Sequence, residues 1–162
     1  MTTYSDITLS QYLEKLSLRE PVPGGGSAAA VSAGLGAALI AMAARYSLGK
    51  GKPPDIEARI GALIVTVDAA RLKFIDLAGR DAQAYLDMVQ ARRSGDAVVL
   101  GKATAEASRV PRDIIALCRA CLSLTPFLHQ EGNPRLLSDV RAGEAFLNAG
   151  MAAAGYMQEA NA

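Results

Sequence analysis

The feature that most constrains the fold is a long uncharged run of small residues, Ser27 to Ala44, which reads SAAAVSAGLGAALIAMAA. The run just reaches the length of a membrane span, but Ala, Gly and Ser dominate it and few large apolar side chains favour insertion into hydrocarbon. Small side chains also let neighbouring backbones approach closely. We therefore expect a buried helix at the centre of a close-packed protein.

The composition indicates the same fold class. The chain has 162 residues, of which 31 are alanines, whereas Phe, Trp and Tyr together make up 5%. Alanine is the strongest helix former, and sheets are typically rich in aromatic and β-branched residues. We predict one all-α domain over residues 1–162, a bundle of about five helices with long central helices. A chain of this length folds without disulfides or metals to hold it together.

The charge balance restricts the partners. Lys and Arg number 17 and Asp and Glu 16, so the formal net charge is +1. This argues against a broad basic surface for nucleic acid or an anionic membrane, and we expect neither partner. Two cysteines cannot form a disulfide framework, and the first residues lack the pattern of a signal peptide. We therefore expect a cytoplasmic protein.

Apolar periodicity and helix-breaking residues divide the chain into helices. Helices are expected to begin near residues 8, 27, 55 and 97. The third should run to about residue 93, and Gly79 within it could bend it. The fourth should kink or restart at Pro111. Residues 127–134 are rich in turn formers, and Asn133 or Ser138 could cap a last helix.

Three glycines and a serine, Gly24, Gly25, Gly26 and Ser27, lead directly into the second helix. Free backbone N–H groups and the positive end of the helix dipole can meet there, where an anion or a polarised oxygen would fit. The stretch is neither a Walker sequence nor a dinucleotide fingerprint, because it follows a helix and lacks the required spacing. A tight turn that permits close helix packing is the alternative interpretation.

Asp81 interrupts the apolar stripe of the third helix. Burying a carboxylate costs free energy unless it is paired, hydrogen-bonded or functional. Asp68 and Asp76, by contrast, have basic residues three or four positions away, which is typical of solvated surface pairs. The pattern leaves Asp81 as either a site residue or a buried structural residue.

Ser138 and Asp139 suit the first turn of a helix, and Lys50 and Lys52 suit a solvated loop. A CxxC pair, Cys118 and Cys121, has the spacing of metal ligands. With a single histidine in the chain it falls short of a four-ligand zinc site, and cysteines on the apolar face of a helix are usually core residues. We expect no metal.

Four segments are more informative together than apart, and they occur in one order over about residues 9–157. They are PVPGGGSAAAVSAGLGAALIAMAARYSLGKGK, DAQAY, VPRDIIALCRAC and EGNPRLLSDV. In this order they resemble the formiminotransferase-cyclodeaminase C-terminal family, also called the cyclodeaminase/cyclohydrolase family.

The resemblance implies a dimeric, all-helical protein that binds tetrahydrofolate derivatives. Cyclodeaminases of the family expel ammonia from 5-formiminotetrahydrofolate, and cyclohydrolases add water to 5,10-methenyltetrahydrofolate to give 10-formyltetrahydrofolate. We favour the cyclohydrolase, because the sequence shows no fused formiminotransferase domain to deliver a formimino substrate. Cyclodeaminase is the alternative enzyme, and a non-catalytic folate-binding or structural dimer is the alternative of a different class.

By matching position, the resemblance places Asp81 on the family's catalytic aspartate, and Lys50 and Lys52 on a basic loop suited to the folate glutamate tail. The substrate-binding residues that it implies are Gly24, Gly25, Gly26, Ser27, Lys50, Lys52, Ser138 and Asp139. The chemistry is consistent, because methenyltetrahydrofolate carries an amidinium cation that a buried carboxylate would stabilise while moving a proton. No cofactor is expected beyond the folate substrate.

The chain departs from the family in two places. Between Tyr85 and Val110 it is shorter, with RRSGDAVVLGK in place of a charge-rich connection, and it ends where family members continue through another long helix. If those parts wall the pocket, substrate affinity should change unless a dimer partner covers the gap.

Overall fold

The structure, a computed structural model, describes residues 4–160, and within that range it contains helices and no strands. In chain order the elements are α1 (Leu9–Ser17), α2 (Gly25–Arg45), α3 (Pro54–Ser94), α4 (Ala97–Leu122), α5 (Thr125–Glu131), the 3₁₀ turn η1 (Pro134–Leu136) and α6 (Leu137–Ala160). The predicted all-α class, with long central helices, is confirmed.

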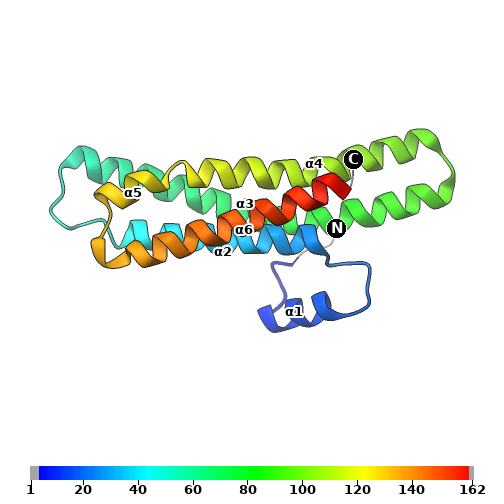
Figure 1. The fold of residues 1–162 in the computed structure, drawn as a ribbon, viewed down its shortest axis with the longest axis horizontal. Helices are drawn as coiled ribbons and strands as arrows, with labels where there is room; N and C mark the ends of the chain where they lie inside the picture. Colours follow the sequence, from blue (N-terminus) through cyan, green and yellow to red (C-terminus); the bar gives the residue numbers. More distant parts are fainter. Residues whose placement is uncertain (1–3, 161–162) are drawn as a thin grey trace.

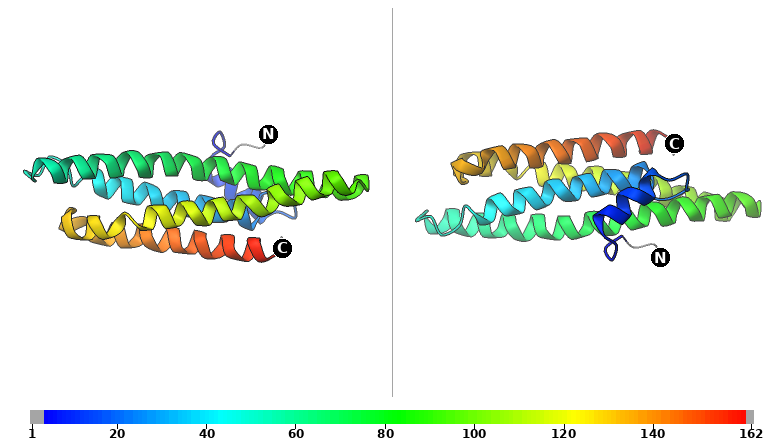
Figure 2. Two further views of the ribbon diagram at one scale, coloured as in Figure 1. Left: turned by 90° about the horizontal axis from the view of Figure 1, so that it is seen from above. Right: turned by 90° about the horizontal axis from the view of Figure 1, so that it is seen from below.

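The four long helices lie side by side in an elongated bundle, and α1 lies outside it beneath α2 (Figure 1). α2 packs along α3 on one side and α6 on the other, and α4 closes the bundle between α3 and α6. Views from above and below show the same neighbours (Figure 2). The ends of α3 and α4 extend past α2 and α6 (Figure 1). We call residues 92–101 the hairpin arm.

The hairpin arm turns through Gly95 and Asp96. Gly95 has a φ of 72°, a left-handed conformation that favours glycine. The Asp96 carboxylate accepts hydrogen bonds from the N–H groups of Val98 and Val99, at 2.8 and 3.1 Å, and so caps α4. All residues from 92 to 99 are exposed.

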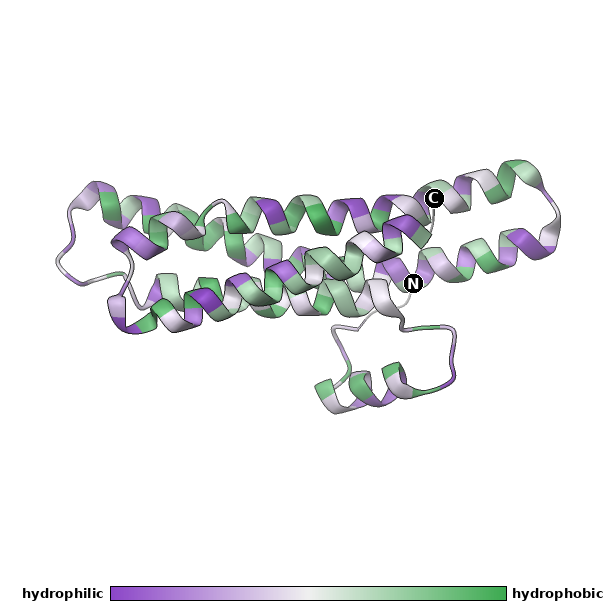
Figure 3. Ribbon diagram, in the orientation of Figure 1, coloured by the Kyte–Doolittle hydropathy of each residue, from purple (hydrophilic) through white to green (hydrophobic). Residues whose placement is uncertain are grey.

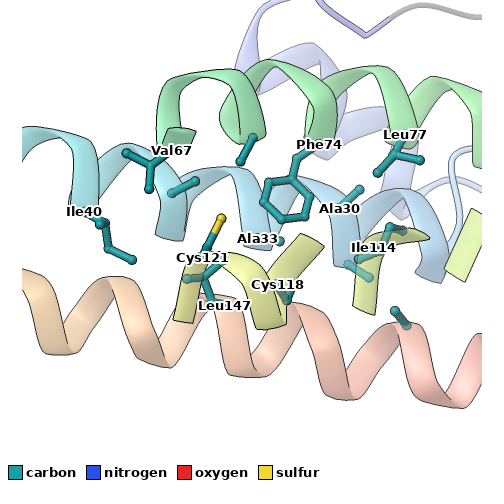
Figure 4. Close-up of a cluster of buried hydrophobic side chains, with 14 of the residues drawn as sticks. Ala30, Ala33, Ile40, Val67, Phe74, Leu77, Ile114, Cys118, Cys121 and Leu147 are labelled. Atoms are coloured by element: carbon teal, nitrogen blue, oxygen red, sulfur yellow. The ribbon is translucent and has the colours of Figure 1, made fainter. Parts of the chain in front are cut away.

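The small residues of α2 have the packing role that the sequence predicts. A Cβ on Gly36 would lie 2.6 Å from the carbonyl oxygen of Gly143, and one on Gly150 would lie 2.7 Å from that of Ala29. Larger residues would therefore force α2 and α6 apart. Larger side chains fill the space toward α3 and α4, among them Phe74, Ile114, Cys118, Cys121 and Leu147 (Figure 4).

α2 is long and apolar enough to cross a membrane by length and composition, and 61% of its most apolar window is buried inside the bundle. It begins at Gly25, two residues earlier than expected. α1 begins where the sequence predicts, and Thr8 caps it: the Thr8 hydroxyl accepts from the N–H of Gln11 at 3.2 Å, and the Gln11 side chain accepts from the N–H of Thr8 at 2.8 Å.

Two local predictions need correction. α4 does not restart at Pro111 but continues through it as one helix, because the buried proline ring packs in the core and this offsets the hydrogen bond it removes. Residues 127–131 of the segment predicted to be turns belong to α5, and the turn is confined to Gly132 and Asn133. Pro126 occupies an early position of α5 that tolerates proline. Gly79 does not interrupt α3.

Candidate functional site

Asp81 lies in α3 opposite the first turn of α2, and its carboxylate fills the space above Gly26. A Cβ on Gly26 would lie only 2.5 Å from Cγ and 2.8 Å from Oδ2 of Asp81. The backbone N–H of Ser27 donates a hydrogen bond to the same carboxylate. The glycine-rich turn and Asp81 therefore form one unit, and glycine is required at residue 26 by this close approach.

The electrostatic surroundings of Asp81 differ from those of Asp68 and Asp76 on the same helix. Lys73 Nζ lies 2.6 Å from Asp76 Oδ2, and Asp68 pairs with Arg45 and Arg71, as the sequence predicts. Among residues 4–160, no basic side chain is paired with Asp81. Burial raises the pKa of the Asp81 carboxyl above its ordinary value, and the Ser27 N–H lowers it only in part.

Two tyrosines lie close to this unit. The hydroxyls of Tyr12 and Ser27 are 3.0 Å apart, and the rings of Tyr12 and Tyr4 meet edge to face with centroids 5.3 Å apart. The buried Tyr4 hydroxyl has no hydrogen-bond partner within the described chain. Desolvation raises the pKa of Tyr4 to about 12 and also raises the pKa of Tyr12, and the charge of Asp81 adds to both shifts. Both phenols therefore stay protonated and can donate.

The sequence did not identify either tyrosine as a site residue. Tyr12 belongs to the apolar stripe of the first helix, where an aromatic residue is more typical of the core. Tyr4 precedes every predicted helix. Their position beside the site becomes clear only from the contact of Tyr12 with Ser27. That contact depends on how α1 folds back on α2.

A cavity of about 410 Å³ opens beside Asp81, within the usual size range of small-molecule sites. We call it the Asp81 cavity. Its walls come from the turn that precedes α2, from α3 and α4, and from the end of α6. Its apolar lining includes Val22, Tyr85, Met88 and Met157. Asp81 and Arg92 are the charged side chains of its lining.

The other predicted substrate-binding residues lie at the opposite end of the bundle. Lys50 and Lys52 follow α2, and Ser138 and Asp139 belong to the first turn of α6. The 21 residues of α2 separate the two ends by about 30 Å. One chain therefore does not bring these four residues to Asp81.

A second cavity, of about 290 Å³, lies at this far end, and Lys50, Lys52 and Arg135 line it. We call it the basic cavity, because its lining contains these cations and no carboxylate. The side-chain amide of Asn133 donates to the carbonyl oxygen of Tyr46 at 3.3 Å and fixes the loop. Sequence reasoning missed Arg135, although it lies in the quoted segment EGNPRLLSDV.

The cysteine pair is part of the core. Burial raises the pKa of Cys118 to about 12 and that of Cys121 to about 11, so both thiols stay protonated. His129 Nε2 lies 2.9 Å from Glu144 Oε1 and so interacts with a carboxylate. Residues 4–160 contain no cluster of three side chains able to ligate a metal.

Comparison with known proteins gives consistent results. Residues 8–162 match the formiminotransferase-cyclodeaminase family. The chain is 28% identical over 151 residues to the methenyltetrahydrofolate cyclohydrolase of Methylorubrum extorquens, and the match covers 88% of this chain and 72% of that protein. It is also 28% identical over 158 residues to the formimidoyltransferase-cyclodeaminase of Mus musculus, but there it spans only 29% of the longer protein.

A solved structure shares the fold. The crystal structure of formiminotetrahydrofolate cyclodeaminase from Thermotoga maritima superposes with a TM-score of 0.92 at 27% sequence identity. The match covers 96% of this chain and 78% of that one.

Proposed function

The chain belongs to the formiminotransferase-cyclodeaminase family, and we propose that it is a methenyltetrahydrofolate cyclohydrolase, which hydrolyses 5,10-methenyltetrahydrofolate to 10-formyltetrahydrofolate. The observation that carries the proposal is the Asp81 carboxylate, held over Gly26 without a basic partner in the described chain, at the edge of a cavity of about 410 Å³. The cyclohydrolase relative, matched over 72% of its own length, supports this reaction.

Asp81 suits this chemistry because the substrate is itself a cation. The amidinium of the methenyl group would take the place of the missing basic partner and balance the carboxylate charge. As water adds to the methenyl carbon, the carboxylate accepts one of its protons and later returns that proton to N5, when the bond between N5 and the carbon breaks. The hydroxyl left on the carbon gives up its own proton to the solvent and becomes the formyl carbonyl, so one proton is released overall. A raised pKa favours this exchange, because it brings the carboxyl closer to the pH at which the enzyme works.

The rest of the Asp81 cavity would position the pterin. Its apolar walls at Tyr85 and Met88 suit a flat ring, and the N–H groups of the first turn of α2 suit a carbonyl oxygen. Adding water to an already cationic carbon needs acid–base groups, so the proposal includes no metal or redox cofactor. It also includes a cytoplasmic homodimer that binds neither nucleic acid nor membrane, in keeping with the net charge of +1.

Cyclodeaminase is the second candidate, because the structural relative from Thermotoga maritima has that name. In that reaction N10 attacks the formimino carbon and ammonia leaves. The same carboxylate would take the proton of N10 and deliver it to the departing amine. The two reactions therefore make the same demand on Asp81 and differ in substrate.

The test is the loss of methenyltetrahydrofolate absorbance, corrected for spontaneous hydrolysis. The wild type should accelerate the loss, and Asp81→Asn should lower the rate on the order of 100-fold or more. Asp76→Asn, which removes a carboxylate from the surface of the same helix, is the matched control and should leave the rate unchanged. An unchanged rate in Asp81→Asn would exclude the role of this residue.

If the wild type does not accelerate the loss, 5-formiminotetrahydrofolate is the next substrate. Release of ammonia that depends on Asp81 would identify a cyclodeaminase. Binding of either folate without turnover would identify a non-catalytic folate-binding protein.

A further inference from the structure

Ser27 connects the Asp81 site to α1. Its backbone N–H donates to the Asp81 carboxylate, and its hydroxyl lies 3.0 Å from that of Tyr12. Ser27 and Tyr12 are both buried, so solvent does not compete for the bond between their hydroxyls. One residue of the glycine-rich turn therefore contacts both the carboxylate and a phenol.

Tyr12 attaches α1 to the bundle. α1 lies outside the four long helices (Figure 1), and hydrophobic residues alternate with polar ones along it (Figure 3). Leu9 and Leu13 of α1 are 65% and 54% exposed, whereas Tyr12 is its buried residue. The contact that holds α1 at the start of α2 is therefore also a contact with the site.

Tyr4 adds a second phenol next to Tyr12. The two rings meet edge to face, and the Tyr4 hydroxyl is buried without a hydrogen-bond partner in the described chain. An unpaired buried donor lowers stability, and phenylalanine would give the same ring contact without that cost. A tyrosine at this position therefore indicates that its hydroxyl is used.

Two hydroxyl hydrogens of this group are left over within the described chain. Whichever of Tyr12 and Ser27 donates in their bond, the other keeps its hydrogen, and so does Tyr4. The Asp81 carboxylate has about four acceptor positions, and the N–H of Ser27 takes one. Burial raises the pKa of both phenols and the charge of Asp81 raises it further, so the phenols lie within its field. Hydroxyl hydrogens rotate to suit such surroundings.

We propose that Tyr4 and Tyr12 are positioning residues for Asp81, and that their hydroxyl groups stabilise its charged form from the side away from the cavity. Neither tyrosine is among the described residues that line the Asp81 cavity, so both act through Asp81 and not on the substrate. The inference rests on the proposed function, in which a charged carboxylate meets the cationic methenyl group. Burial alone would favour the neutral acid, which can neither balance that charge nor accept a proton from water. The phenols limit this effect.

The other titratable groups near Asp81 lie on its open side. Among the described residues, α3 supplies Tyr85 and Arg92 to the lining of the cavity. The parts of α4 and α6 that line it supply alanine and methionine side chains, and the first turn of α2 supplies glycines and a serine. Tyr4 and Tyr12 can therefore be altered without removing a titratable group of the cavity.

Carbon NMR of isotope-labelled aspartate side chains tests the inference without any assay of activity. The Asp81 signal is identified by its loss in Asp81→Asn, and its titration midpoint is compared between the wild type, Tyr4→Phe and Tyr12→Phe. Each variant keeps the ring and removes a donor, so the midpoint should move to higher pH. The inference fails for any tyrosine whose variant leaves the midpoint unchanged or lowers it.

Tyr156→Phe is the matched control for the titration. It removes the same hydroxyl from an exposed residue of α6 and should leave the Asp81 midpoint unchanged. A midpoint that moves as far in this variant as in Tyr4→Phe would mean that the shift does not come from the phenols beside Asp81.

Reaction rates test whether the tyrosines act through Asp81. In Tyr4→Phe, kcat/KM should match the wild type on the pH plateau and be up to about tenfold lower on the acid limb, because more of the carboxyl is protonated there. In the Asp81→Asn background, adding Tyr4→Phe should leave the residual rate unchanged. A loss of the same size at every pH, or a further loss in Asp81→Asn, would mean that Tyr4 does not act through this carboxylate.

The two measurements separate this inference from the proposed function. An inactive wild type whose Asp81 titration still depends on Tyr4 and Tyr12 would count against the proposed reaction alone. An active wild type with one midpoint in all variants would keep the reaction and exclude the tyrosines from it.

Discussion

Residue 26 decides how close Asp81 can come to the backbone of α2. In Gly26→Ala the new Cβ would overlap the end of a side chain, so the carboxylate would move while the helices stay in place. Because a displacement of about 1 Å can lower a rate by about 100-fold, we expect a loss of that order in turnover. The measurement is kcat/KM beside the unfolding free energy.

Gly61→Ala is the matched control for this prediction. Gly61 lies inside α3 and a Cβ there would meet no atom within 4 Å. The variant should keep its activity and gain up to about 1 kcal/mol of stability from helix propensity. Full activity in Gly26→Ala would show that the carboxylate is not held at this place for function.

The raised pKa of Asp81 predicts a particular dependence of stability on pH. Between its ordinary value of 3.8 and its folded value, the folded state binds the proton more tightly than the unfolded state. This contribution to stability is complete below the ordinary value and is lost as the pH rises through the folded value. Asp81→Asn has no such proton, so its unfolding free energy relative to wild type should increase across that window.

Urea unfolding of both proteins at several pH values checks this prediction. The difference between them should be smallest near pH 4 and largest at neutral pH. A difference that stays constant, or that falls as the pH rises, would show that the surroundings of Asp81 favour the carboxylate over the acid.

At the scale of residues, the sequence indicated Asp81 because one carboxylate in an apolar stripe is a local pattern. It could not indicate Tyr4 or Arg135, whose places depend on contacts between segments distant in the chain. The same limit applies to Lys50 and Lys52. Their charge is visible in the sequence, but their distance from Asp81 depends on the length and direction of α2 in the folded protein.

Among the elements, the contact of α2 with α6 has the least room for change. In Gly150→Ala, the Cβ would approach the carbonyl oxygen of Ala29 at 2.7 Å and the N of Ala33 at 3.0 Å. Because these are backbone atoms, a helix must shift, and we expect a loss of about 1–3 kcal/mol in the free energy of unfolding.

Gly155→Ala, five residues further along α6, is the matched control. No atom lies within 4 Å of its Cβ, so the free energy of unfolding should stay the same or rise by up to about 1 kcal/mol. Urea denaturation of the two variants measures the contrast. Equal effects would mean that helix propensity, and not close packing, decides the stability at both positions.

The helices themselves were largely predictable, because each long one has an apolar stripe and clear breakers at its ends. The errors arose where tertiary contacts outweighed a local signal. Pro111 was a candidate restart point in α4, but the helix runs through it and its buried ring lies in the core. The turn formers between Phe127 and Pro134 did not prevent α5, whose Leu128 side chain is fully buried.

For the whole molecule, stability should be uneven along the bundle. The hairpin arm has no large buried side chains, whereas Phe74 and Leu77 in the middle of α3 are fully buried. Amides of the arm should therefore exchange with solvent through local opening, at least about 100-fold faster than amides around Phe74. Hydrogen exchange followed by mass spectrometry measures this, and equal protection along α3 would contradict it.

Because of the hairpin arm, the covering of the Asp81 cavity can change without a change in the packing around Asp81. Its turn, at Gly95 and Asp96, lies outside the bundle, so a heptad removed from or added to each of its two helices would keep the same sides facing each other. Arg92, in the last turn of α3, lines the Asp81 cavity. Insertions and deletions at the tip can therefore alter how far the cavity is roofed, and thus which ligands fit, while the packing that holds Asp81 over Gly26 is inherited unchanged.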